Sequence, residues 1–144
     1  MPNETEQQAQ PVRVSGITVR TGRLVCDVVI ADERYRHTTP KLAAFVTSSY
    51  PDLPHHACVN GKGSTFGSVI EHTSTPHLLE HLAISLQTRR AADATEPFVG
   101  TTEWVDEAQG IACVQVSFRD DLEALRAFNE ATQFINIAVL TCSA

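Results

Sequence analysis

The stretch HLLEH at positions 77–81 places two histidines and a glutamate at spacings that suit metal chemistry. On a helix each residue turns by about 100°, so His77, Glu80 and His81 project from one arc of roughly 100°. The leucines of the same segment, with Ala83, fall on a different arc and can pack into a core. We therefore expect the HxxEH face and the apolar face of this helix to be separate.

Two histidines four residues apart on a helix can both bind one Zn²⁺ ion. The intervening glutamate then lies beside the open coordination position, where it can accept a proton from water. The order HxxEH is the inverted form of the zincin motif. The segment predicts a zinc site with His77 and His81 as ligands and Glu80 as general base. Another divalent metal is an alternative, and so is an ordinary helix that carries two surface histidines.

A zinc site needs a third protein ligand, and the residues leave its identity open. His56, in the run HHAC, and Glu71, six residues before His77, are the two candidates that we favour. The other candidates are less attractive: His55, His72, Glu103, Glu123 and Glu130. The run GKGSTFG lacks the residue order of a phosphate-binding loop, so we expect no phosphate site there.

Composition and charge bound the classes of protein to which the chain can belong. Its 144 residues are a normal length for one domain, and with 42% hydrophobic and 19% charged residues a packed core is expected. The net charge of −6, without a Lys/Arg cluster, argues against nucleic acid and anionic membranes as partners. No apolar run approaches the length of a membrane span, and the N-terminus does not resemble a secretory signal. The four scattered cysteines do not suggest a disulfide framework, so we expect a cytoplasmic protein, with homo-oligomerisation left open.

The expected elements define an α+β fold. Residues 1–11 have no hydrophobic period and are expected to be a disordered tail, followed by a single α+β domain of residues 12–144. The expected elements in chain order are two strands in 16–30, helices that open at Thr39-Pro40 and Thr75-Pro76 with a Gly-rich loop (59–68) between them, strands at 102–105 and 111–118, and a helix capped by Asp120. The order ββ-α-α-ββ-α predicts an antiparallel-rich sheet with helices packed on one face.

The segment from Leu53 to Gln87 resembles the N-terminal domain of cyanophycin synthetases. That family shows LPxLxxHxCS, a Gly-rich stretch with a phenylalanine, and EGTxxGHVxEHVALELQ. This chain has LPHHACVNGKGSTFGSVIEHTSTPHLLEHLAISLQ, and the run GIACVQVSFRDDLEALRAFNEATQFI is similar to a later segment of the family. The matching residues are His56, Cys58, Phe66, Glu71, Thr73, His77, Glu80, His81, Ala83, Leu86 and Gln87. The departures are His72 and Pro76, which replace glycines, and Ser85, which replaces a glutamate.

The resemblance implies a small α+β domain that handles a polymer. In that family the domain precedes an ATP-grasp and a Mur-ligase-like domain, which make an aspartate backbone decorated with arginine. In some members it is a metal-dependent hydrolase that trims the polymer. The 144 residues contain neither ligase domain, so we expect a stand-alone relative rather than a synthetase.

The motif and the resemblance together predict a metal-dependent peptidase or amidase. Its substrate would be a peptide or an arginine-decorated aspartate polymer. The resemblance also favours His56 and Glu71 as third ligand over the other acids, because both occupy matching positions. The alternatives are a non-catalytic domain that binds polymer or protein in the same groove, and a structural subunit of a larger assembly.

Overall fold

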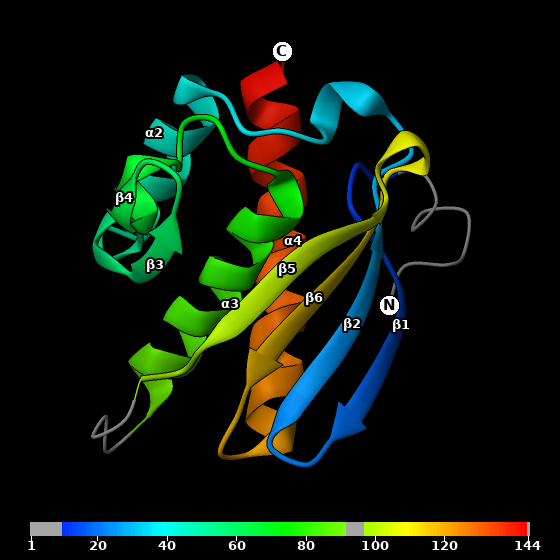
Figure 1. Ribbon diagram of the computed structural model, residues 1–144, viewed down its shortest axis with the longest axis vertical. Coiled ribbons are helices and arrows are strands. Elements are labelled where there is room, and N and C mark those ends of the chain that lie inside the picture. Colours follow the sequence, from blue (N-terminus) through cyan, green and yellow to red (C-terminus); the bar gives the residue numbers. More distant parts are fainter. Residues whose placement is uncertain (1–9, 92–96, 144) are drawn as a thin grey trace.

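A four-stranded antiparallel sheet is the frame of the protein, whose computed structural model describes residues 10–91 and 97–143 (Figure 1). The strands are β1 (Arg13–Arg20), β2 (Arg23–Val29), β5 (Gly100–Asp106) and β6 (Ile111–Ser117), in the spatial order β1-β2-β6-β5. Strands β1 and β5 are therefore the two edges of the sheet. Most of the expected disordered tail, residues 1–9, lies outside the described residues.

Alternation along the two central strands gives the sheet one buried face. Every second residue of β2 and β6 is buried, because successive side chains of a strand point to opposite faces. The buried residues are Leu24, Cys26 and Val28 on β2, and Ala112, Val114 and Val116 on β6. This face is the side on which helices can remove apolar surface from water.

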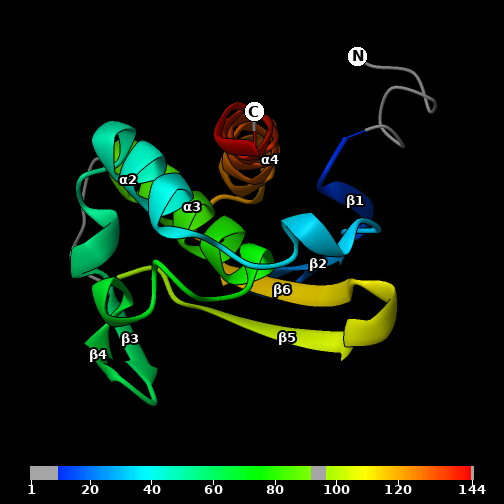
Figure 2. The same cartoon turned by 90° about the horizontal axis from the view of Figure 1, so that it is seen from above.

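Three α-helices complete the layer over this face: α2 (Pro40–Ser49), α3 (Thr75–Arg90) and α4 (Asp121–Ser143). Seen from above, α3 and α4 lie on the same side of the sheet, and α2 lies farther out (Figure 2). Helix α3 packs against β5 and β6 as well as against α4. The predicted α+β class, with an antiparallel sheet and helices on one face, is confirmed.

Helix α3, which carries the HxxEH segment, begins at an N-cap and a proline in its first turn. The Ser74 hydroxyl accepts a hydrogen bond from the backbone N–H of His77 at 3.2 Å, so Ser74 rather than Thr75 caps the helix. Pro76 lies in the first turn, where its missing N–H costs no helical hydrogen bond. Arg89 and Arg90 end the helix, beside the negative end of its dipole.

The predicted Gly-rich loop between α2 and α3 is in part a β-hairpin, which adds a strand pair to the expected element order. Its strands are β3 (Ala57–Asn60) and β4 (Gly63–Thr65). Asn60 closes the turn, because its side-chain oxygen accepts the backbone N–H groups of Lys62 and Gly63, each at 2.9 Å. The glycines predict a loop, whereas Gly61 and Gly63 lie at the tight turn between two short strands. The hairpin stands beside α3 and forms part of the site described below.

Candidate functional site

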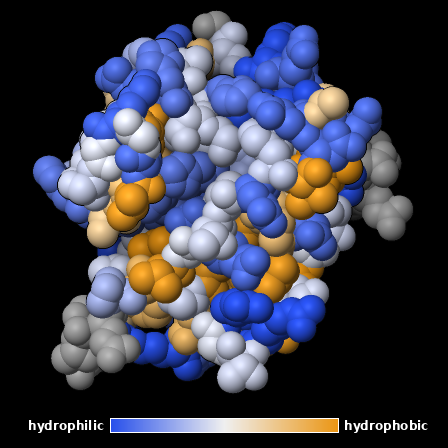
Figure 3. All heavy atoms as spheres, in the orientation of Figure 1, coloured by the Kyte–Doolittle hydropathy of each residue, from blue (hydrophilic) through white to orange (hydrophobic). Residues whose placement is uncertain are grey.

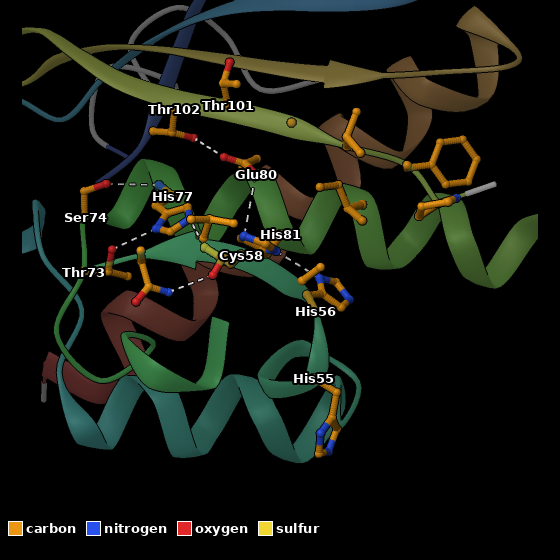
Figure 4. A pocket seen from close by; sticks show the side chains of 18 of the residues that line it. His55, His56, Cys58, Thr73, Ser74, His77, Glu80, His81, Thr101 and Thr102 are labelled. Atoms are coloured by element: carbon orange, nitrogen blue, oxygen red, sulfur yellow. Dashed lines mark hydrogen bonds and ion pairs between the residues drawn. The ribbon is translucent and has the colours of Figure 1, made fainter. Parts of the chain in front are cut away.

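A cleft of about 1080 Å³ lies between the β3–β4 hairpin and strand β5, with one side of α3 as its floor. The space-filling view shows a hollow there, with hydrophilic residues inside and hydrophobic residues on its lower rim (Figure 3). The close view shows His77, Glu80 and His81 projecting from α3 toward it (Figure 4). The HxxEH segment therefore faces this cleft.

The two faces expected for the HxxEH segment are separate. Leu78, Leu79 and Leu82 are fully buried in the hydrophobic core, away from the cleft. Glu80 and His81 line the cleft but are only 4% and 3% exposed. They lie deeper than side chains on an open groove, because β5 and the hairpin cover this side of the helix.

His77 presents one ring nitrogen to Cys58 of the hairpin. Its Nδ1 lies 2.9 Å from the hydroxyl of Thr73, and its Nε2 lies 3.5 Å from the Cys58 sulfur. A neutral ring that donates from Nδ1 to the Thr73 hydroxyl keeps its lone pair on Nε2. Burial lowers the pKa of His77, which favours this neutral form.

His81 is oriented by a chain of hydrogen bonds. The Nδ1 atoms of His81 and His56 are 3.0 Å apart, and Nε2 of His56 lies 2.8 Å from Oδ2 of Asp52. A carboxylate only accepts, so a neutral His56 carries its proton on Nε2 and accepts on Nδ1. His81 must then donate from its own Nδ1, which leaves the lone pair on Nε2. We refer to Asp52, His56 and His81 as the histidine chain.

The free nitrogen of His81 is the anomaly of the site. Its Nε2 is buried and has no hydrogen-bond partner among the described residues. Burial, with smaller contributions from His77 and His56, lowers the pKa of His81 to about 3, so the ring is neutral at physiological pH. A buried nitrogen whose lone pair has no partner destabilises the folded protein unless a ligand binds to it. The neutral imidazole is also the form of histidine that binds metals.

Asp52, the far end of the histidine chain, is itself held in place. The Ser85 hydroxyl donates to Oδ2 of Asp52 at 2.7 Å, and Arg89 lies 3.6 Å from Oδ1. Burial raises the pKa of Asp52, but hydrogen bonds from Ser85 and His56 outweigh it, so the net pKa is lowered. The carboxylate therefore stays ionised and keeps the proton on Nε2 of His56.

Phe66 packs against the imidazole rings of both His77 and His81. This side chain is fully buried and stacks on His81 with ring centroids 4.0 Å apart. It meets the ring of His77 edge-on, with a centroid distance of 4.9 Å. Both rings thus have little freedom to leave their present orientation.

Cys58, His77 and His81 form a cluster that could hold a metal ion. Their candidate ligand atoms all lie within 4.8 Å of one another. In a tetrahedral zinc site, bonds of about 2.3 Å to sulfur and about 2.05 Å to nitrogen place the two atoms about 3.6 Å apart. The observed distance of 3.5 Å between Cys58 Sγ and His77 Nε2 fits this value. The donor types, the spacing and the unpaired nitrogen of His81 all suit a metal.

Glu80 lies beside this cluster and is hydrogen-bonded to Thr102 of β5. The Thr102 hydroxyl donates to Oε1 of Glu80 at 2.8 Å, and Oε2 lies 3.6 Å from Nε2 of His81. Burial raises the pKa of Glu80 to about 7, although the hydrogen bond from Thr102 opposes the shift. Gly100 makes room for the side chain, because a Cβ there would lie 2.8 Å from Glu80 Cγ.

The two favoured third-ligand candidates have different places in the structure. His56 is in the cleft, but Asp52 and His81 already engage both of its ring nitrogens. Glu71 is exposed and does not line the cleft, because the adjacent Ile70 turns inward to the core. The less favoured candidates lie apart from the cluster. His55 lines the cleft, but its ring points away from Cys58, His77 and His81. His72 and Glu103 are exposed, and Glu123 and Glu130 pair with Arg90.

Sequence reasoning missed Cys58 as a candidate ligand. A signal was present, because residues two apart on an extended segment face the same side, and Cys58 follows His56 by two. The same HxC pair is part of the family resemblance. Its meaning became clear only with the hairpin, which turns the Cys58 sulfur toward His77.

The fold and the site together define an α+β domain with a Cys/His cluster, able to hold a metal, in a cleft beside a buried glutamate. No membrane-spanning segment was found among the helices of residues 10–91 and 97–143. The model of the cyanophycin synthase-like N-terminal domain matches residues 23–139, so the chain belongs to this family, and the resemblance expected from the sequence is confirmed. No curated protein matches the chain.

Proposed function

We propose that the protein is a zinc-dependent hydrolase that cleaves an amide bond in a peptide or an isopeptide. One observation carries the proposal: ligand atoms of Cys58, His77 and His81 converge beside Glu80 at the floor of the cleft. Catalytic zinc sites use three protein ligands and keep one position for water or substrate. The arrangement supports a catalytic site better than a closed structural one.

The ligands that we propose are Nε2 of His77, Nε2 of His81 and the thiolate of Cys58. Cys58 takes the place for which the sequence suggested His56 or Glu71. His56 instead supports His81 through the histidine chain, as a neighbour that orients a metal-bound imidazole commonly does. When bound, the ion would polarise the substrate carbonyl and make water easier to deprotonate.

Glu80 is the proposed general base and acid. Its carboxylate accepts a proton from the attacking water while a C–O bond forms at the amide carbon. The same proton then passes to the nitrogen as the C–N bond breaks, which releases a carboxylic acid and an amine. Thr102 holds one carboxylate oxygen by its hydroxyl and leaves the other on the side of His81.

Two substrates follow from the family and the motif. An arginine-decorated aspartate polymer is implied by the family resemblance, and an ordinary peptide by the HxxEH motif.

The test of the proposal is elemental analysis of the untagged protein, combined with incubation on that polymer and on a peptide mixture, each with and without a chelator. We expect about one zinc ion per chain and cleavage that the chelator stops. A His77→Ala variant should lose both. A protein that binds no metal, or that cleaves neither substrate when loaded, would overturn the proposal and favour a binding domain.

The histidine chain predicts a measurable effect at a distance from the ion. In Asp52→Asn the proton on His56 Nε2 is no longer held by a carboxylate, so the tautomer of His81 is less well fixed. We expect metal affinity to fall by about 10–100-fold, the range typical of outer-sphere partners of metal ligands. Competition with a chromophoric chelator measures it.

Asp27→Asn on the exposed side of β2 is the matched control, and should leave affinity unchanged. Because a merely structural role for Asp52 would lower the unfolding free energy without changing affinity in the folded protein, both quantities are measured. Unchanged affinity in Asp52→Asn would refute the orienting role.

A further inference from the structure

We infer that the cleft binds its substrate as an extended polypeptide strand that pairs with the free edge of β5. The inference deepens the proposed function and rests on it for the reaction. The substrate would be recognised mainly through backbone hydrogen bonds, and these form only with a chain in β conformation.

Among residues 10–91 and 97–143, strand β5 is paired along one edge and unpaired along the other. It is the last strand of the sheet order β1-β2-β6-β5, so β6 is its partner on one side only. The backbone N–H of Ser117 donates to the carbonyl of Val99 at 2.8 Å, which marks these opposite residues as a hydrogen-bonded pair. Such pairs alternate along antiparallel strands, so Thr101 and Glu103 bond to β6 next. The backbone groups of Gly100 and Thr102 consequently point away from the sheet.

The unpaired edge borders the cleft beside the metal cluster. Gly100 and Thr102 line the cleft, and so does Trp104, whose backbone has the same outward direction. Thr102 also holds Glu80 through its hydroxyl. A strand paired to this edge would therefore pass next to the proposed general base.

The opposite wall of the cleft is a strand as well. All four residues of β3 (Ala57–Asn60) line the cleft, and within the described part of the chain β3 pairs only with β4. The cleft is thus a trough between two strands, each with a free edge, over the helix α3. An extended chain suits a trough of this form better than a compact molecule.

The two edges of the sheet differ in their protection against pairing. Strand β1 has a bulge between Val14 and Gly16 and an arginine at each end, features that discourage the addition of a strand. In β5 the irregularity comes only after Trp104, and residues 100–104 contain neither proline nor lysine. The part of β5 that borders the cleft is the part that remains open to pairing.

The rim of the cleft offers contacts for side chains of such a strand. Val59 on β3 is 100% exposed and Val99 is 61% exposed, and both line the cleft. Substrate side chains that alternate along a paired strand would meet these apolar residues on one side. Backbone pairing would supply most of the affinity, and the rim a modest preference.

The first experiment is an N-methyl scan. A tryptic digest of a denatured protein is incubated with the zinc-loaded enzyme, and the most rapidly cleaved peptide is resynthesised with one backbone N-methyl group at a time. Each methyl removes one N–H donor, and a hydrogen bond of about 1.4 kcal/mol corresponds to tenfold. We expect kcat/KM to fall about tenfold or more at every second residue and to change little between. Cleavage with a flat or non-alternating scan would overturn the inference while the hydrolase stands.

The second experiment does not depend on turnover. Hydrogen exchange of backbone amides is measured in Glu80→Gln with and without the same digest. We expect slower exchange at Gly100 and Thr102, whose N–H groups face the cleft, and unchanged exchange at Thr101 and Glu103, which bond to β6. Protection without any cleavage by the native enzyme would uphold the strand site and refute the hydrolase. Absence of protection would refute the strand site.

Discussion

Replacing Glu80 with glutamine is expected to abolish most of the hydrolysis while leaving metal binding intact. Glutamine keeps the size of the side chain and can still accept the hydrogen bond from Thr102. It cannot take up a proton from water, and general acid–base catalysis contributes about 10²–10⁴-fold. We therefore expect kcat/KM to fall by that factor at an unchanged metal content, measured by peptide cleavage and by elemental analysis.

The matched control for this variant is Glu103→Gln. Glu103 is on the same strand as Thr102, but it is exposed and is not among the residues that line the cleft. Its replacement should leave both turnover and metal content as they are. If Glu80→Gln retains full turnover, Glu80 is not the base, and the proposed mechanism fails even if zinc is present.

Replacing Cys58 with alanine is expected to remove the metal from a protein that stays folded. Structural zinc sites bind with about 10–16 kcal/mol shared by four ligands, so one ligand corresponds to about 3 kcal/mol, or on the order of a hundredfold in affinity. Cys58 is half-buried on the hairpin rather than in the core strands, so the unfolding free energy of the metal-free protein should change little. Titration with zinc against a competing chelator measures the effect.

A series at the other candidate positions separates the possible third ligands. Cys113→Ala, on the sheet face away from the helices, controls for the loss of a thiol and should bind zinc normally. Glu71→Ala should also bind normally, since Glu71 is exposed and outside the cleft. His56→Ala should show an intermediate loss, because His56 orients His81. If Glu71→Ala lost the metal and Cys58→Ala kept it, our assignment of the ligands would be wrong.

The helix that carries the HxxEH segment was predictable because its geometry is local. The angular relation of His77, Glu80 and His81 is fixed by the helical repeat, whatever surrounds the helix. The Thr-Pro start and the arginines at the end marked its limits to within a residue. Even so, the periodicity underestimated the burial of Glu80 and His81, because it contains no information on what packs against the polar side.

The proposed third ligand, Cys58, could not be chosen from the sequence because its place in the site depends on a non-local contact. Cys58 lies 19 residues before His77, and its position follows from a hairpin closed by the side chain of Asn60. Runs of glycine and polar residues predict turns well, but they do not show which short strands will pair around them. Glu71 was a reasonable candidate by spacing alone, yet the inward turn of Ile70 directs it to solvent.

The same limit applied to strand β5. The stretch TEWV (102–105) predicted a strand, and the antiparallel class followed from the paired elements. Its place at the edge of the sheet, next to Glu80, depends on the register with β6 and on the fit of Gly100 against the carboxylate. Neither the register nor this close approach has a local signature.

The packing of Phe66 against the two imidazoles, stacked on His81 and edge-on to His77, has a consequence for how the protein would take up a metal ion. Rings that are already immobilised lose almost no rotamer entropy on coordination, so loading needs no rearrangement of the polypeptide. The core that surrounds them is built of leucine, isoleucine and valine rather than of ligand bonds. A zinc finger folds only when its metal binds, whereas this chain should stay folded while the metal is removed and bound again repeatedly.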